Sequence, residues 1–250
     1  MEHQKSRGLS AIKEIPAMTM CLLRSLPIAV TVIFIVDNIL MNLLAGYSLL
    51  NLPWLALNWA ITVSWVSFLI LDIVTKRFGP GAANTLSLIA AVTNMTCALL
   101  CFGLSKVFSN PALDFVLGGQ WSVFTASTIA FILSSILNNF LNALIGKLFV
   151  KNPDGKGAYA ARSFVSTFIS QFTDNFVFLI LAFFIFPLIP SALQVTWTIP
   201  QILTCSILCA GLELLSEVLF APIGYKVVSI WKAKNTGAEY IEKYYEEAKA

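Results

Sequence analysis

The 250-residue chain has 58% hydrophobic but only 12% charged residues, and its mean hydropathy is +0.80. Because a soluble domain carries about 25% charged residues, these values exclude a soluble globular enzyme and predict a protein whose solvent is lipid. The formal net charge is only +3 and the basic residues do not gather on one polar face, which argues against nucleic-acid binding.

Six apolar stretches are long enough to be transmembrane helices, since about 20 helical residues cross the roughly 30 Å hydrocarbon layer. We expect an all-α, polytopic membrane fold. The predicted spans, in chain order, are Pro27–Leu50, Trp54–Ile73, Leu86–Val107, Ser122–Phe149, Ser163–Leu188 and Ile199–Ile230. An N-terminal segment (1–26), a six-helix domain (27–230) and a charged tail (231–250), expected to be a solvated helix, make up the predicted organisation.

Basic residues are distributed unequally between the two sides of the predicted spans. Fifteen of the sixteen lysines and arginines lie before the first span, between the second and third, between the fourth and fifth, or at the end of the sixth and beyond. Only Lys106 lies on the opposite side. The positive-inside rule therefore predicts that both termini are cytoplasmic and that the chain is a multi-pass protein of the cytoplasmic (inner) membrane.

Residues typical of hydrolytic or redox chemistry are scarce. The single histidine, His3, lies in the N-terminal segment, and the sequence has no Ser-His-acid arrangement, no HExxH and no phosphate-binding glycine loop. Cys97/Cys101 and Cys205/Cys209 are i, i+4 pairs within apolar spans, where packing is a better explanation than a soft-metal site. We expect no enzyme, no cofactor and no structural metal.

Four acidic residues lie deep inside predicted spans, away from the span ends, where an ionisable group is costly and by default marks a pathway or a site. Asp37, Asp174 and Glu213 fall roughly 15–18 Å from a membrane edge, near the midplane. Glu217 lies one turn nearer the cytoplasm, on the same helix face as Glu213. No lysine or arginine occurs at this depth in any span. The sequence therefore predicts a functional polar cavity.

Amides accompany these acids in a pattern that recurs on three predicted helices. The pattern occurs as Val36-Asp37-Asn38-Ile39, Leu137-Asn138-Asn139-Phe140 and Thr173-Asp174-Asn175-Phe176. Residues 134–140 align without gaps on residues 170–176. Because the first and fourth helices cross in opposite directions, the pattern suggests two three-helix halves of inverted topology, as in many secondary transporters. Interhelical hydrogen bonds that only stabilise the bundle are the alternative explanation.

At the end of the second predicted span the chain reads Leu71-Asp72-Ile73-Val74-Thr75-Lys76-Arg77-Phe78-Gly79. This run resembles the signature that follows the second helix of the queuosine-precursor transporters, also called the vitamin uptake transporter family, although Asp72 with Lys76 one turn on is also typical of a surface pair. Arg162-x-x-x-Ser166-x-x-x-Ser170-Gln171-x-x-Asp174-x-x-x-Phe178 resembles its fifth-helix motif, and Pro222-x-x-Tyr225 and Asn38 match its sixth and first helices. The chain departs from the pattern at Ser135 and Asn138, and it lacks a lysine near Glu213.

The resemblance implies uptake of a 7-deazaguanine: 7-cyano-7-deazaguanine, its aminomethyl relative or queuine. A carboxylate can accept both the N–H and the NH₂ of a guanine-type edge. The expected substrate-binding residues are Asp174 and Gln171 at the base edge, Asn38 and Asn138 as further polar contacts, Glu213 as a second anion, and Asp37 and Glu217. The expected partners are a purine-like small molecule and the lipid bilayer, and the oligomeric state is left open.

Two other functions are compatible with six apolar helices. One is the substrate-binding subunit of an energy-coupling-factor vitamin importer, which would need separate ATPase and coupling subunits. The other is a non-transporting membrane scaffold, in which the polar residues would only stabilise helix contacts. The motifs favour a carrier that works alone.

Overall fold

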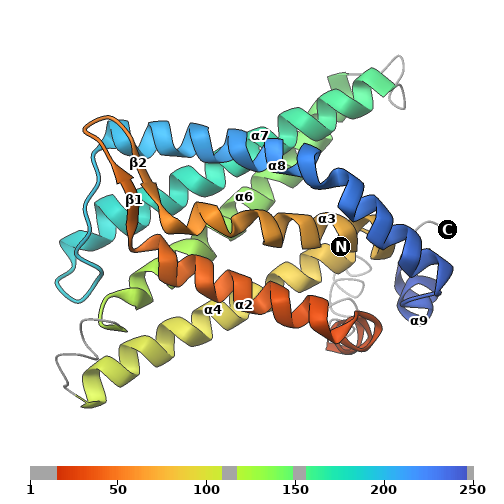
Figure 1. The fold of residues 1–250 in the computed structure, drawn as a ribbon, viewed down its shortest axis with the longest axis horizontal. Helices are drawn as coiled ribbons and strands as arrows, with labels where there is room; N and C mark the ends of the chain where they lie inside the picture. The colour runs from red at the N-terminus through yellow and green to blue at the C-terminus, as the bar shows by residue number, and fades with distance from the viewer. Residues whose placement is uncertain (1–15, 109–116, 149–155, 247–250) are drawn as a thin grey trace, which may run out of the picture. The chain divides into compact units, whose positions relative to one another are not determined.

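The computed structural model describes residues 16–108, 117–148 and 156–246, and these are mostly helical (Figure 1). Residues 16–25 are helical. The longer helices that follow are α2 (Ile28–Ala45), α3 (Ser64–Phe78), α4 (Pro80–Phe108), α6 (Gln120–Leu148), α7 (Lys156–Ile180) and α8 (Ile199–Ala233). Among the described residues, five helical segments are long and apolar enough to cross a membrane. The protein is therefore a polytopic helical membrane protein.

The second predicted span, Trp54–Ile73, is not one helix. Strands β1 (Ser48–Asn51) and β2 (Ala56–Asn58) form an antiparallel hairpin, and a 3₁₀ turn (Trp59–Thr62) precedes α3. With 15 residues, α3 is about 22 Å long, which is shorter than the hydrocarbon layer. The prediction of a helix from Trp54 was wrong because periodicity alone does not distinguish a short apolar strand from the start of a buried helix.

The other predicted spans differ from the observed helices mainly at their ends. Gly79 ends α3 with a φ of +88°, and Pro80 then opens α4 at the first helical position, where its missing N–H costs nothing. At its far end α7 continues as a π-helical segment, η2 (Leu181–Ile185), and a 3₁₀ turn, η3 (Phe186–Leu188). The predicted fifth span therefore covers three kinds of helix.

The chain divides into two compact units. The first comprises Met1–Val36, Val66–Ala90 and Phe220–Ala250, and the second comprises Asp37–Trp65 and Ala91–Leu219. Helices α2, α4 and α8 contribute residues to both units. Each unit has its own apolar core.

Phe78 is at the centre of the first unit's core. Its ring lies edge-on to the rings of Trp231, at 5.8 Å, and Tyr240, at 6.1 Å. The neighbouring Arg77 donates its Nε–H to the carbonyl of Thr236 at 3.0 Å. The end of α3 is thereby joined to the segment that follows α8.

This packing changes the interpretation of the charged tail. The described part of the tail forms two short helices, α9 (Ala238–Tyr240) and η4 (Ile241–Glu246). Tyr240 is only 2% exposed, whereas Glu239 and Lys243 are exposed. The tail is therefore not simply a solvated helix, because its aromatic residues are packed while its charged residues face water.

Asp72 and Lys76 form an ion pair on α3, with 2.7 Å between Oδ2 and Nζ. Both side chains are partly exposed, and a pair of this kind contributes at most about 1 kcal/mol. The surface pair expected from their spacing is confirmed.

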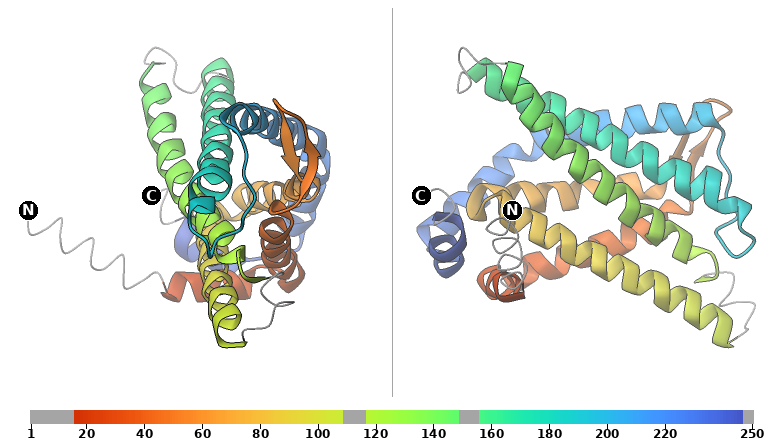
Figure 2. Two further views of the ribbon diagram at one scale, coloured as in Figure 1. Left: turned by 90° about the vertical axis from the view of Figure 1, so that its left-hand side faces the viewer. Right: turned by 180° about the vertical axis from the view of Figure 1, so that it is seen from behind.

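The second unit contains α6 and α7, which run side by side in opposite directions (Figure 2). Phe183 of η2 stacks on Trp197 with ring centroids 4.6 Å apart, and the backbone N–H of Trp197 donates to the carbonyl of Phe183 at 2.9 Å. These contacts fix the chain that leads from η2 to the start of α8.

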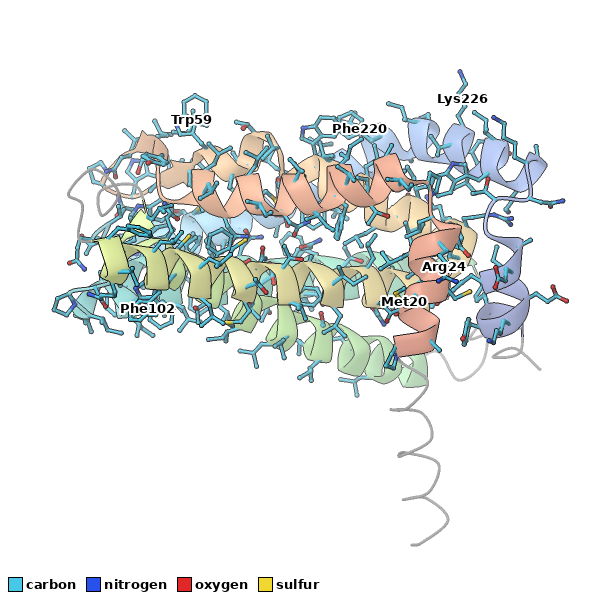
Figure 3. All side chains as sticks on the ribbon, turned by 90° about the horizontal axis from the view of Figure 1, so that it is seen from below. Met20, Arg24, Trp59, Phe102, Phe220 and Lys226 are labelled. Carbon is cyan, nitrogen blue, oxygen red and sulfur yellow. The ribbon has the colours of Figure 1, made fainter. Side chains whose placement is uncertain are left out.

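Apolar side chains are exposed along the described helices. Figure 3 shows Phe102 on α4 and Trp59 before α3 at the surface of the ribbon. Ile28, Val107 and Leu188 are exposed to a still greater extent. Because contiguous apolar surface of this kind is rare on monomeric soluble proteins, it supports lipid contact.

We predict that Gly237→Ala loosens the tail. Gly237 has a φ of +73°, and an added Cβ would collide with the Phe78 ring. The left-handed backbone alone costs an L-residue about 1–2 kcal/mol. The variant should unfold at a lower temperature in detergent and be cleaved faster by protease within residues 234–246. Gly103→Ala, in α4 with open space around the new methyl group, is the control, and equal behaviour of the two variants would contradict the prediction.

Candidate functional site

Polar residues line one face of α7. Ser170, Asp174 and Phe178 are spaced four residues apart, so they follow one another along one side of the helix. Gln171 and Asn175 form a second row beside them. Both rows belong to the second unit.

Asp174 is joined to α6 by a hydrogen bond. The hydroxyl of Ser134 donates to Oδ1 of Asp174 at 2.8 Å, and Ser134 itself is buried. Oδ2 of Asp174 makes no hydrogen bond to any residue that the structure describes. Half of this carboxylate is therefore available to a ligand.

Asn175 joins α7 to α8. Its Nδ2 lies 3.3 Å and 3.2 Å from the two carboxylate oxygens of Glu213, and it also donates to the carbonyl of Gln171 at 2.9 Å. Glu213 is buried. A neutral amide thus positions this acid, and no lysine or arginine occurs in residues 163–225.

Two further polar groups on α7 have no partner. The Ser170 hydroxyl is buried and finds no hydrogen bond within the described part of the chain. The side-chain amide of Gln171 is half-buried and makes none to a described residue. Because buried polar groups are normally paired, the Ser170 hydroxyl is an exception, and with Gln171 and Oδ2 of Asp174 it makes up a set of polar groups that a polar ligand would satisfy.

One aromatic ring lies on the same face. Phe178 is half-buried one turn beyond Asp174, and its ring is edge-on to Phe183 with centroids 5.9 Å apart. Phe172 and Phe176 stack on each other at 5.8 Å, but their spacing from Asp174 places them on the opposite side of α7. A ligand at Asp174 would therefore meet Phe178 first.

The predicted site residues are distributed as follows. Asp174, Gln171 and Glu213 lie in one polar cluster of the second unit with Ser134, Ser170 and Asn175. The cluster contains two separate hydrogen-bonded groups: Asp174 with Ser134, and Asn175 with Glu213 and the backbone carbonyl of Gln171. Of the remaining predicted residues, Asp37 is buried on α2 in the same unit. The backbone carbonyl of Asn38 accepts a hydrogen bond from Nδ2 of Asn42 at 2.8 Å. The side chains of Asn138 and Glu217 lie outside the described residues.

Three residues of the cluster were not among the predicted site residues: Ser134, Ser170 and Asn175. All three lie within the aligned segments 134–140 and 170–176, so the alignment of these segments could have pointed to them. They were overlooked because small neutral side chains in membrane helices commonly serve helix packing.

The cysteines do not form a metal centre in the described part of the protein. The Sγ atoms of Cys205 and Cys209 lie 3.6 Å apart within the second unit's apolar core. No group of three or more His, Cys, Asp or Glu side chains is placed to bind a metal among the residues searched. The pair acts as core packing.

We predict that Ser134→Ala lowers the free energy of unfolding by about 1–3 kcal/mol, the usual cost of leaving a buried polar partner unsatisfied. Ser135→Ala, at the neighbouring and partly buried position, should change it by less than about 0.5 kcal/mol. Thermal unfolding in detergent measures both. Equal midpoints for the two variants would show that the hydrogen bond to Asp174 contributes nothing.

Comparison with known proteins identifies the family. Residues 58–227, more than half of the chain, match the family described as "putative vitamin uptake transporter". No curated protein and no solved structure matches the chain. The matched range contains the α7 cluster and Glu213, and it confirms the resemblance found in the sequence motifs. The chain belongs to the vitamin uptake transporter family of membrane proteins.

Proposed function

We propose that the protein imports a queuosine precursor across the cytoplasmic membrane by alternating access. The substrate would be 7-cyano-7-deazaguanine, 7-aminomethyl-7-deazaguanine or queuine. The observation that carries the proposal is a set of polar groups on α7 that have no hydrogen-bond partner among the described residues: the Ser170 hydroxyl, the Gln171 side-chain amide and Oδ2 of Asp174. Membership of a vitamin uptake family supports transport.

The chemistry of these groups suits a guanine-type base. Such a base presents an N–H and an NH₂ side by side, and a carboxylate can accept both. Ser134 uses one lone pair of Asp174 and leaves others for the ligand. The amide of Gln171 and the hydroxyl of Ser170 can donate to the carbonyl and ring nitrogens, while Phe178 offers a stacking surface.

Glu213 acts as a second anion in this proposal. Residues 163–225 contain no basic side chain, and Asn175, which donates to the Glu213 carboxylate, is neutral. Protonation of Glu213, or a cationic group of the ligand beside it, would lower the cost of burying this acid. It would bind the aminomethyl cation of one candidate substrate or carry a proton that is coupled to uptake.

The transport cycle would use two halves of inverted topology, related by the polar pattern on α2, α6 and α7. Asp37, Asn38, Asn138 and Glu217 would supply further contacts near the midplane. Both termini, residues 1–26 and 231–250, would lie in the cytoplasm, in agreement with the distribution of basic residues.

Substitution of the two acids tests the site. We expect Asp174→Asn to reduce uptake at low substrate concentration by about 10-fold or more, because a hydrogen bond to a charged group contributes about 1.5–3 kcal/mol. Glu213→Gln should reduce uptake as well. Uptake of labelled 7-cyano-7-deazaguanine would be measured in cells that lack their own transporter, with membrane expression checked. Glu239→Gln, the same change at an exposed position of α9, is the matched control.

Two outcomes would contradict the proposal. If Asp174→Asn and Glu213→Gln both fold and transport like the wild type, the assigned residues do not form the site. If the purified protein in liposomes neither binds nor takes up the base saturably, it is not the carrier. Uptake only after ATPase and coupling subunits are added would instead identify the subunit of an energy-coupling-factor importer.

A further inference from the structure

The β1–β2 hairpin and its flanks present an apolar surface, which we name the hairpin surface and define as residues 47–59. No charged residue occurs in residues 38–71. All four residues of β1 are exposed. Trp54 is 59% exposed and Trp59 is 45% exposed, and Figure 3 shows the Trp59 ring standing away from the ribbon.

Hydrogen bonds attach the hairpin surface to the end of α2 and to the start of α8. Tyr47 donates its backbone N–H to the carbonyl of Leu44 at 3.0 Å, so the hairpin continues directly from the last turn of α2. On its other side, Gln201 Nε2 donates to the carbonyl of Leu52 at 2.7 Å, and Thr204 Oγ1 donates to the carbonyl of Trp54 at 2.6 Å.

Gln201 and Thr204 belong to the first two turns of α8. Both α2 and the first part of α8 are candidate membrane spans. The hairpin therefore lies at the membrane face where one span ends and the other begins. Because the hairpin is continuous with helices that contact lipid, its position indicates that lipid covers its exposed side chains.

The backbone of the hairpin suits this location. Residues Leu50 and Asn51 pair with Leu57 and Ala56, and Leu52 donates to the carbonyl of Leu55 at 2.7 Å across the turn. These bonds reduce the number of unsatisfied backbone groups, and at the edge of the hydrocarbon layer headgroups and water can pair with the groups that remain.

We propose that the hairpin surface is a lipid-binding anchor whose partner is the boundary between the headgroups and the acyl chains. Tryptophan and tyrosine concentrate at this boundary, where the ring meets acyl chains and the polar atom meets carbonyl groups and water. Tyr47, Trp54 and Trp59 would take this role. The anchor is a property of the protein in its membrane and does not depend on the transported substrate.

Fluorescence quenching in liposomes tests the anchor. Phosphatidylcholine brominated near the headgroup end of its acyl chains should quench a variant that retains only Trp54 more strongly than lipid brominated near the chain end. Iodide in the aqueous phase should quench it weakly. A variant that retains only Trp197, which is buried in the same unit, should be quenched by neither lipid nor iodide.

Single substitutions test the same proposal if the variants that retain only one tryptophan fail to fold. Trp54→Phe and Trp59→Phe in the otherwise native chain should each lose part of the emission that shallow brominated lipid quenches. Quenching of Trp54 by iodide but not by lipid would place it in water. Protection from both would mean that protein, such as a second copy of the chain, covers the surface. Either result overturns the anchor.

Discussion

The constraint on which the site depends is the cost of a carboxylate inside a membrane segment that contains no basic side chain. Asp174 and Glu213 are each held by a neutral donor, the Ser134 hydroxyl and the Asn175 amide. Neutral donors offset only part of the cost of removing a charge from water. In the proposed function, N–H donors of the bound base lower this cost at Asp174. A carboxylate that is better satisfied with its ligand than without it suits a carrier, because ligand release leaves the site ready to bind again.

The two longer family motifs have different physical roles. In the first, Phe78 fills the core of one unit, Gly79 adopts a positive φ that permits the turn into α4, and Arg77 holds the segment after α8. The fifth-helix motif instead supplies Ser170, whose buried hydroxyl has no partner among the described residues, and Asp174, which accepts a hydrogen bond from Ser134. The first motif thus stabilises the fold, and the second is where we place substrate recognition.

Much of the helical framework could be predicted, because hydrophobic length and the depth of acids follow from the rise per residue. Asp174 and Glu213 were singled out in this way, and Gln171 through the resemblance of the fifth-helix motif. The donors Ser134 and Asn175 were not predicted, since their role depends on which helices are neighbours in the fold, and the sequence does not show this. The hairpin at 48–58 was missed because a short apolar run has no period that separates a strand from a helix. The packing of Tyr240 was hidden by the charges around it.

The central claim is that the Asp174 carboxylate recognises the N–H and NH₂ edge of a base. The most direct measurement is calorimetric binding of 7-deazaguanine and of 7-deazahypoxanthine, which lacks the exocyclic amino group, to purified wild type and Asp174→Asn. The account predicts tighter binding of 7-deazaguanine by the wild type and a loss of this preference in the variant. Equal affinities for the two bases in the wild type, or a preference that survives the substitution, would contradict it.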